Sequence, residues 1–307
     1  SSTSRGLGDV YKRQMMVIGF RNDSKVGGQG LTPTEEEAHF GLWCIMSSPL
    51  LIGCNLENMP DSSLELLTNK ELIALNQDPL GLQAYVAQHE NEGYVLVKDI
   101  EQKRGNVRAV ALYNPSDTIC SFSVPFSSLE FGGNVKVRDL VKHSDLGNFS
   151  GTFEQTLPAH SAMFLRIEGE TRLEPTLYEA EWAYLPLFND LGKNPKGIIY
   201  AHDKEASGKM KVGFLGGQPE NYAEWREVYS ENGGRYDMTI HYLYGKGRQI
   251  ELDVNGIITK IDSLGEDNGH NQITVPVELK AGYNTIRMGN SYNWAPDIDC
   301  FTLTKAL

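Results

Sequence analysis

Two kinds of apolar pattern take turns near the start of the chain. Residues 15–19 (MMVIG) and 49–53 (PLLIG) are apolar without polar alternation, which is typical of parallel strands covered on both faces. Residues 32–46 and about 62–75 instead carry apolar side chains at the spacing of one helical face. Strand, helix, strand, helix is the order of units in a β/α barrel, so this region predicts the closing units of one.

The first helix has a clear start signal. Thr32 is followed directly by Pro33 and, three positions after it, by Glu35. A capping threonine, a proline at the first helical position and a glutamate in the first turn form a capping box, in which side chains bond the free backbone N–H groups. We therefore expect a helix that begins at Pro33.

The pattern changes at Tyr85. Short apolar or alternating runs now lie between Gly, Asn, Pro and Ser turns, which predicts an antiparallel sandwich of short strands. Residues 168–175 form a polar bridge, and a second all-β block begins at Leu177. The strands expected are 94–98, 107–113, 120–124, 136–140 and 162–167 in the first block, and 234–244, 249–254, 271–279, 284–289 and 298–304 in the second.

Composition narrows the classes of partner. The 307 residues are 40% hydrophobic and 22% charged, as in ordinary globular domains, and the formal net charge is −12. Nucleic acid or an anionic membrane would require a basic surface, so the net charge argues against both as partners. No run of about 18 apolar residues occurs, so no transmembrane helix is expected. A neutral ligand is compatible with this charge.

The four cysteines form neither a disulfide framework nor a zinc motif. They are scattered without any CxxC pair, and three of them lie inside apolar runs, where a free thiol behaves as a small hydrophobe.

The first fourteen residues are expected to be foreign to the fold. Residues 4–14 (SRGLGDVYKRQ) match the translation of a common transposase-derived sequencing adapter. We therefore treat residues 1–14 as an adapter-derived or disordered leader and expect the protein's own sequence to begin at Met15.

Several short motifs in order resemble one glycosidase family. MMVIG at 15–19, GLT at 30–32, HFGLW at 39–43, SPLLIG at 48–53 and IALNQDPLG at 73–81 resemble the last third of a melibiase-type α-galactosidase barrel of glycoside hydrolase family 27. The following block, with RDL at 138–140 and PAH at 158–160, is similar to the domain that this family places after its barrel.

The resemblance implies retaining hydrolysis of terminal α-linked galactose. One carboxylate attacks the anomeric carbon and a second protonates the leaving oxygen, with the two carboxyl groups about 5 Å apart. Both aspartates of the family precede the position of Met15, so no residue of this chain inherits a catalytic role and the chain itself is expected to be inactive. Met15 alone carries over as a sugar contact, an apolar floor under the ring; the alternative is a methionine that merely ends a buried strand.

Three other residues invite catalytic interpretations that we decline. His39 lies one helical turn from Glu35, but a packing histidine is the better interpretation than a proton shuttle. Asp78 precedes a proline in a glycine-bounded turn, where aspartate bonds its own backbone. His160, near a strand start, is interpreted as structural.

The C-terminal block resembles carbohydrate-binding modules of the family 6 and family 35 type. The motifs are YEAE at 178–181, GRY at 234–236, VNG at 254–256, LKAGYNTI at 279–286 and ID at 298–299. Glu179 and Glu181, one residue apart on an extended segment, point to the same side and, with Asp299, could ligate a structural Ca²⁺ ion. The alternative is a solvated acidic edge.

A sugar site is expected in the loop at residues 290–297. Sugar binding needs an aromatic plane and polar groups for the hydroxyls, which this loop supplies. Asn290 and Trp294 are the first candidates, followed by Tyr292 and Trp225. The alternative is that these tryptophans belong to the core of the sandwich.

The fold class expected is a multidomain chain: a remnant of a (β/α)8 barrel, an all-β antiparallel sandwich and a β jelly-roll carbohydrate-binding module. The function expected is that of a fragment of a secreted or periplasmic α-galactosidase acting on a galactose-containing oligo- or polysaccharide, with Ca²⁺ in the module and no cofactor for catalysis. The alternatives are a binding protein without catalysis, or the same fold acting on α-N-acetylgalactosamine, β-L-arabinopyranose or an isomaltose-type glucan. The parts are residues 1–14, 15–84, 85–168 and 172–307.

One further expectation concerns residues 15–85. A quarter of a barrel exposes unpaired edges and apolar faces, so this piece should be loosely held unless it packs on the sandwich that follows.

Overall fold

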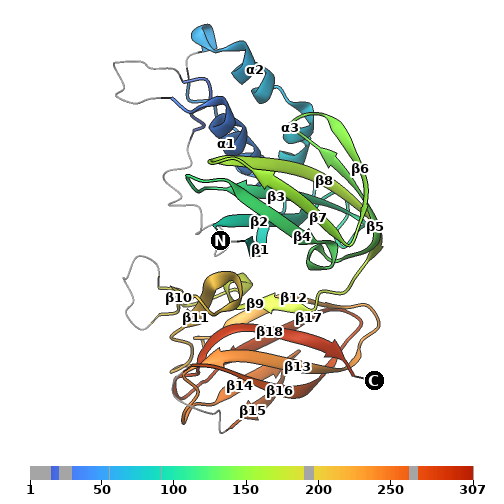
Figure 1. Ribbon diagram of the computed structural model, residues 1–307. Helices are drawn as coiled ribbons and strands as arrows, with labels where there is room; N and C mark the ends of the chain where they lie inside the picture. The colour runs from blue at the N-terminus through green and yellow to red at the C-terminus, as the bar shows by residue number, and fades with distance from the viewer. Residues whose placement is uncertain are drawn as a thin grey trace. The chain divides into compact units, whose positions relative to one another are not determined.

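The computed structural model describes residues 15–20, 30–54, 56–90, 92–189, 197–262 and 269–306. The expected leader, residues 1–14, lies outside these ranges. The chain divides into two compact units: the first ends at Leu173, and the second consists chiefly of Glu174–Leu307. Figure 1 draws the first unit from blue to light green and the second from yellow to red.

The first unit opens with helices in the places expected. Helix α1 (Pro33–Ile45) begins at the capping box: Thr32 Oγ1 accepts a hydrogen bond from the Glu35 N–H, and Glu35 Oε2 accepts one from the Thr32 N–H at 2.8 Å. The prediction of a single helical stretch over 62–75 was wrong in one respect. The stretch forms two helices, α2 (Asp61–Leu67) and α3 (Lys70–Asn76). Asn69 accepts from two N–H groups of the first turn of α3 and so starts a new helix.

The two segments expected to be barrel strands, 15–19 and 49–53, are joined by a single parallel β-bridge. Met16 pairs with Ile52, its N–H donates to Leu51 O at 2.7 Å, and Gly53 N–H donates to Met16 O at 3.0 Å. The parallel direction agrees with the barrel interpretation, although within the described residues neither segment is long enough to form a strand.

A buried carboxylate ties this bridge to the helices. Glu36 of α1 accepts a hydrogen bond from the Gly19 N–H at 2.9 Å and another from Ser63 Oγ at 2.6 Å. Because Ser63 belongs to α2, one side chain joins three segments of the barrel piece.

An antiparallel sandwich completes the first unit (Figure 1). One sheet has the order β1-β2-β3-β8-β5-β6, and β4 pairs with β7 to form the other. Five of the strands were predicted; β1, β6 and β7 were not. Their bounds are β1 Tyr85–Glu90, β2 Gly93–Asp99, β3 Val107–Asn114, β4 Cys120–Pro125, β5 Phe131–Asp139, β6 Ser144–Ser150, β7 Thr152–Leu157 and β8 Ser161–Arg172.

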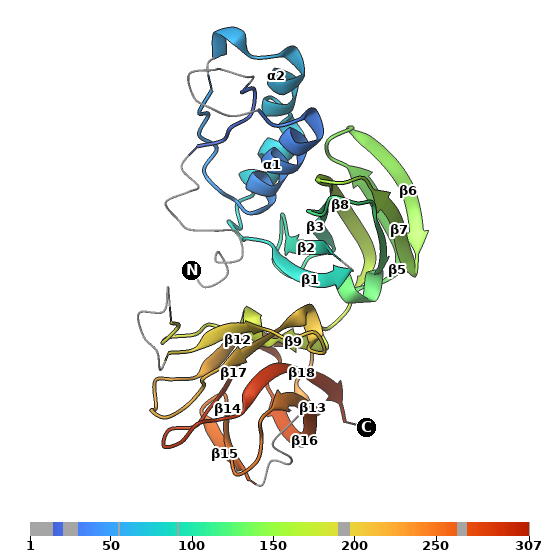
Figure 2. The same cartoon turned by 60° about the vertical axis from the view of Figure 1, so that its left-hand side comes forward.

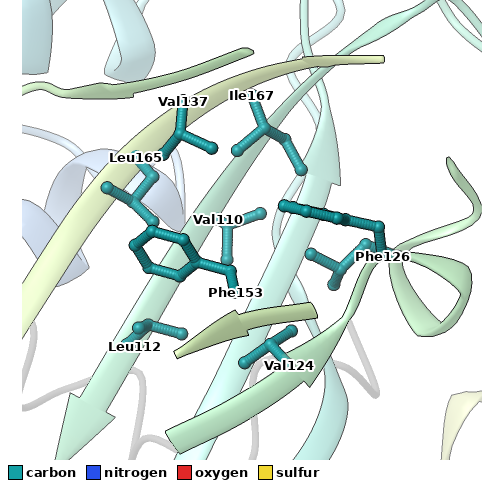
Figure 3. Close-up of a pocket in the computed structure, with 9 residues that line it drawn as sticks. Val110, Leu112, Val124, Phe126, Val137, Phe153, Leu165 and Ile167 are labelled. Carbon is teal, nitrogen blue, oxygen red and sulfur yellow. The ribbon is translucent and has the colours of Figure 1, made fainter. Parts of the chain in front are cut away.

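The six-stranded sheet is apolar on both faces. In β3, Val110 and Leu112 face the β4–β7 layer, where nine apolar side chains surround a small gap in the core (Figure 3). Ala109 and Ala111 point to the opposite face and belong to the core that the helices cover. Successive side chains of a strand point to opposite faces of the sheet. The continuous apolar run of β3 therefore requires that both faces of the sheet be covered.

Helix α1 covers the second face (Figure 2). Gly41 lies so close to β8 that a Cβ atom added there would be 2.0 Å from the Phe164 ring. The shared core also contains Met16, Phe40 and Cys44 from the barrel piece. The described part of residues 15–85 therefore packs on the sandwich, which was the condition for it to be firmly held.

The buried side chain of Lys98 in β2 links the sheet to the helical segments by hydrogen bonds. Its ammonium donates to Ser47 Oγ at 2.9 Å, Leu75 O at 3.2 Å and Leu82 O at 3.1 Å. Burial among these neutral acceptors lowers the pKa of Lys98 to about 8.

The second unit is a two-sheet antiparallel β-sandwich. One sheet has the order β10-β11-β18-β13-β16, with β9 also paired to β18, and the other has the order β12-β17-β14-β15. The five predicted strands correspond to β13, β14, β16, β17 and β18; the others were not predicted. The bounds are β9 Leu177–Glu179, β10 Ile199–His202, β11 Met210–Gly213, β12 Ala223–Ser230, β13 Gly234–Leu243, β14 Ile250–Val254, β15 Ile257–Ile261, β16 His270–Leu279, β17 Gly282–Gly289 and β18 Asp297–Lys305.

Gly41→Ala tests the docking of α1. Alanine in a helix interior ordinarily stabilises by about 0.5–1 kcal/mol relative to glycine. Here the added methyl group overlaps Phe164, so we expect the free energy of unfolding to fall by about 1–3 kcal/mol. Urea unfolding of the full chain measures it, and Gly41→Ala/Phe164→Leu should lose less than the sum of the single variants. A stabilising Gly41→Ala, or strict additivity, would contradict this packing.

Lys98 predicts a pH dependence of stability. Its folded pKa lies below the ordinary 10.5, so between about pH 8 and 10.5 the unfolded state binds more protons than the folded state. The free energy of unfolding should therefore rise with pH across this window, on the order of 3 kcal/mol. Lys98→Met should remove that rise. Parallel pH profiles for the two proteins would be inconsistent with a buried ammonium.

Candidate functional site

A cluster of acidic side chains lies where β9 runs beside β18. Cys300 pairs with Glu179 across these strands, and Asp299 precedes Cys300. One ligand atom from each of Glu179, Asp299 and Cys300 lies within 4.8 Å of the other two. Glu181 follows in a short 3₁₀ helix, η5 (Ala180–Trp182), so the glutamates are not both on an extended strand as the sequence suggested.

The carboxylates of this cluster are buried and incompletely hydrogen-bonded. Glu179 and Asp299 are each 5% exposed. Among the described residues, Glu179 Oε2, Glu181 Oε2 and Asp299 Oδ1 are buried without a hydrogen-bond partner. Burial raises the pKa of Glu179 to about 7 and that of Glu181 to about 8, and it also raises the pKa of Asp299. Three buried carboxylate oxygens without partners fit a divalent cation, because a cation compensates their desolvation.

The segment between β10 and β11 closes over the cluster. Ser207 Oγ donates to Glu179 Oε1 at 2.5 Å. Gly208 has φ +58°, and a Cβ atom there would lie 2.5 Å from Glu181 Oε1. Only glycine leaves room for the Glu181 carboxylate, so Gly208 brings the backbone close to the acidic side chains.

The loop before β18 presents two of the four predicted sugar contacts to solvent. Tyr292 is 80% exposed and Trp294 is 38% exposed. The Phe214 ring lies edge-on to the Trp294 ring, with centroids 6.1 Å apart, and Gly217 is positioned so that its Cβ would be 3.8 Å from the indole. Phe214 and Trp294 therefore form an exposed aromatic corner of which the sequence predicted one half.

The other two candidates hold the structure together. Trp225 is 4% exposed, belongs to the core and donates its indole N–H to Glu179 O at 2.8 Å. It has no face for a sugar, which corrects the interpretation of Trp225 as a platform. Asn290 is 5% exposed, and its Oδ1 accepts from the backbone N–H groups of Tyr292 and Asn293. Asn290 thus shapes the loop that displays Trp294.

Met15 lies beside the parallel bridge of the barrel piece. Its side chain is 57% exposed, and it borders Gly53, whose Cβ would be 3.0 Å from Met15 Cβ. The exposed position next to the parallel bridge leaves Met15 available for contact with a ligand.

The three declined residues have structural partners. The His39 ring packs against Trp43 with centroids 4.3 Å apart, and burial lowers its pKa. Asp78 Oδ1 accepts from the Leu80 N–H at 3.1 Å, as expected of a turn. His160 Nε2 lies 2.8 Å from Asp117 Oδ1 in a surface turn. These contacts agree with the structural interpretations of the three residues.

Sequence reasoning missed four contributors to these sites. Ser207 and Gly208 are ordinary turn residues in the sequence, and no periodicity marks their approach to Glu179. Phe214 is exposed and adopts a left-handed conformation, with φ 59°, and neither property is marked in the sequence. Cys300 lies in an apolar run, which gave no sign that its thiol faces carboxylates.

Both family models that match the chain fall within the first unit. The model described as Alpha galactosidase A matches residues 14–78, and the model described as Alpha galactosidase C-terminal beta sandwich domain matches residues 92–167. This order agrees with a barrel piece followed by a sandwich. None of the helices in the described residues is long and apolar enough to cross a membrane.

Curated relatives point the same way. Alpha-galactosidase 3 of Arabidopsis thaliana is 39% identical over 139 residues, which cover 44% of this chain and 32% of the relative. The alpha-galactosidase of Cyamopsis tetragonoloba is 34% identical over 139 residues, 45% of this chain and 33% of the relative. The chain thus spans about a third of the length of these relatives. The resemblance to α-galactosidases, a class of glycoside hydrolase, is confirmed.

One solved structure is similar over both units. The isomalto-dextranase of Arthrobacter globiformis T6, complexed with panose, aligns with a TM-score of 0.52 at 18% identity, covering 94% of this chain and 49% of that chain. At this identity the likeness concerns the fold alone.

Proposed function

We propose that this chain is a fragment of an α-galactosidase that hydrolyses terminal α-linked galactose with retention. The observation that carries the proposal is the matching of residues 14–78 and 92–167, in order, to the two family models. The packing of α1 on the sandwich sheet supports it, because it joins the two matched parts into one core. Secretion and action on galactose-containing oligo- or polysaccharides belong to the same proposal.

The chain itself contributes no catalytic carboxylate in this proposal. Retaining hydrolysis needs two carboxyl groups about 5 Å apart across one sugar. Three acidic residues of the barrel piece have other partners: Glu36 is buried and bonded to Gly19 and Ser63, Glu35 caps α1, and Asp78 holds a turn. Met15 then serves as the apolar floor of a sugar site whose acid and nucleophile come from elsewhere in the whole enzyme.

The second unit is proposed as a carbohydrate-binding module that keeps the enzyme near its substrate. Trp294, with Phe214 beside it, offers an exposed apolar plane for a sugar ring. Tyr292 extends the aromatic surface, and the Lys260 ammonium lies 5.6 Å from its ring centre. Asn290 positions the loop and, because it is buried, does not contact the sugar directly in this proposal.

A structural Ca²⁺ ion at Glu179, Glu181 and Asp299 completes this proposal. Calcium accepts six to eight oxygen ligands, and the three unpaired carboxylate oxygens supply part of that set. The ion would fix β9 and η5 against β18 and would neutralise charge that is otherwise buried. It has no part in hydrolysis.

Activity and binding should separate in this chain. With an aryl α-galactoside, the full chain should release no phenol. On affinity gels containing a galactose-substituted polysaccharide it should be retarded, and Trp294→Ala should weaken binding by about tenfold or more, a loss of about 1.4 kcal/mol. Tyr283→Ala, another half-exposed aromatic residue, is the matched control and should bind as the wild type does. Hydrolysis by the chain would contradict the claim that it lacks catalytic carboxylates. Equal retardation of both variants would contradict the claim that Trp294 binds the sugar.

Calcium should stabilise the second unit through the acidic cluster. We expect Ca²⁺ to raise the melting temperature of the full chain and EDTA to reverse the change. Glu181→Gln should abolish the calcium effect yet leave the metal-free protein no less stable, because the amide needs no proton uptake when it is buried, whereas burial of Glu181 raises its pKa to about 8. Glu220→Gln, an exposed substitution, is the control. Differential scanning calorimetry measures both, and an undiminished calcium shift in Glu181→Gln would exclude Glu181 as a ligand.

A further inference from the structure

The outer face of the four-stranded sheet in the second unit carries two arginines that share one carboxylate. Glu224 of β12 lies opposite Arg287 of β17, and both alternate along their strands with residues of the core, so their side chains point away from it. One oxygen of Glu224 accepts the Nε–H of Arg226, and the other accepts the Nε–H of Arg287. The Glu224 side chain is 3% exposed, whereas those of Arg226 and Arg287 are 56% and 44% exposed. A covered carboxylate thus anchors two arginines that reach solvent.

A tyrosine ring lies against each guanidinium group. Arg226 Cζ is 3.8 Å from the centre of the Tyr184 ring, and Arg287 Cζ is 4.9 Å from the centre of the Tyr222 ring. Backbone hydrogen bonds in both directions between Tyr184 and Glu224 hold the first of these rings beside β12. Burial alone would raise the pKa of Glu224, but its hydrogen bonds with the two arginines lower it, so the carboxylate stays ionised. Ring and carboxylate together fix the orientation of both guanidinium groups.

The terminal amino groups of the two arginines are left for a ligand. A guanidinium group has several N–H donors, and Glu224 uses the Nε–H of each. In the part of the chain that the structure describes, the terminal amino groups of Arg287 have no hydrogen bond, and Arg226 adds only a contact with the Tyr184 hydroxyl. Asp253 of β14 lies opposite Arg287, yet among the described residues no ion pair joins the two side chains.

These donors suit a sulfate ester better than a carboxylate. A single guanidinium fork already fills both oxygens of a carboxylate in a bidentate pair. A sulfate ester has more free oxygens than one fork can fill, so it can accept hydrogen bonds from two arginines at once. The net charge of −12 and the nearby Asp253 oppose a densely charged polymer, so recognition must depend on the positions of the donors. A polymer with widely spaced sulfate groups meets both conditions.

We propose that this face of the second unit binds a sulfate ester of a galactose-containing polysaccharide through Arg226 and Arg287. Glu224 is a positioning residue, because it orients both guanidinium groups without contacting the ligand. The site lies on the sheet and uses none of the residues of the aromatic corner at Trp294. The choice of a galactan as the polymer rests on the proposed function, whereas the recognition of sulfate does not.

Affinity gel electrophoresis of the full chain tests the proposal with one polymer in two forms. The probes are a sparsely sulfated galactan and the same galactan after chemical desulfation. The wild type should bind the sulfated form at least about tenfold more tightly, as expected for charge-assisted hydrogen bonds from two arginines. Arg226→Gln and Arg287→Gln should each bring the two affinities close to each other. Equal affinity of the wild type for the two forms would overturn the proposal.

Two further arginine variants separate donor geometry from charge. Arg235→Gln is the matched control, because Arg235 is exposed on β13 of the other sheet and the substitution removes the same charge. It should keep the wild-type preference, and an equal loss in this variant would overturn the site in favour of unspecific attraction. Arg287→Lys keeps the charge beside Glu224 but removes the planar fork, so it should lose the preference while melting near the wild-type temperature. Full preference in Arg287→Lys would overturn the role of the fork.

The last two arms distinguish this site from the aromatic corner and sulfate from carboxylate. Trp294→Ala should weaken binding of both galactan forms by a similar factor and leave their ratio unchanged. Failure of the proposed Trp294 contact is therefore distinguishable from failure of the arginine site. Polygalacturonate carries carboxylates only, and Arg287→Gln should not change its retardation. A loss there as large as with the sulfated galactan would overturn the assignment of sulfate.

Discussion

The packing of helix α1 against the six-stranded sheet is the contact on which the first unit depends. A sheet with apolar side chains on both faces needs two layers of cover, and β4–β7 supplies only one. The barrel piece supplies most of the buried side chains of the second core, and Ala109, Ala111 and Phe164 of the sandwich complete it. The two parts therefore share one core, which explains how a small portion of a barrel holds a defined structure.

Buried charge is the corresponding constraint in the second unit. The pairing of β9 with β18 forces Glu179 and Asp299 together, and Gly208 leaves space for Glu181 beside them. Their desolvation and mutual repulsion oppose folding unless the carboxyls take up protons or a cation is bound. The same β18 carries Cys300, and the loop before it displays Trp294. A metal bound at this strand would thus be coupled structurally to the aromatic corner through a short stretch of chain.

The sequence was most informative where local rules and burial agree. The capping box of α1 and the apolar runs of β3 and β8 located those elements, and the ordered motifs identified the resemblance to α-galactosidases. The edge strand β6 (SDLGNFS) was missed because it is mostly exposed and lacks apolar alternation. Trp225 was misjudged because the register shift after it in β12 hides which face it occupies. The metal cluster could be guessed from its acids, but the inclusion of Cys300 required the strand register.

Hydrogen–deuterium exchange on the full chain, with and without a divalent ion, tests this account most directly. Amides of α1 should be protected in both conditions, because the sandwich already holds the helix. Amides in β9, η5 and the first residues of β18 should gain protection only when the ion is present. Exchange of α1 at the rate of an unfolded chain, or protection of β9 and β18 that is independent of the ion, would contradict the account.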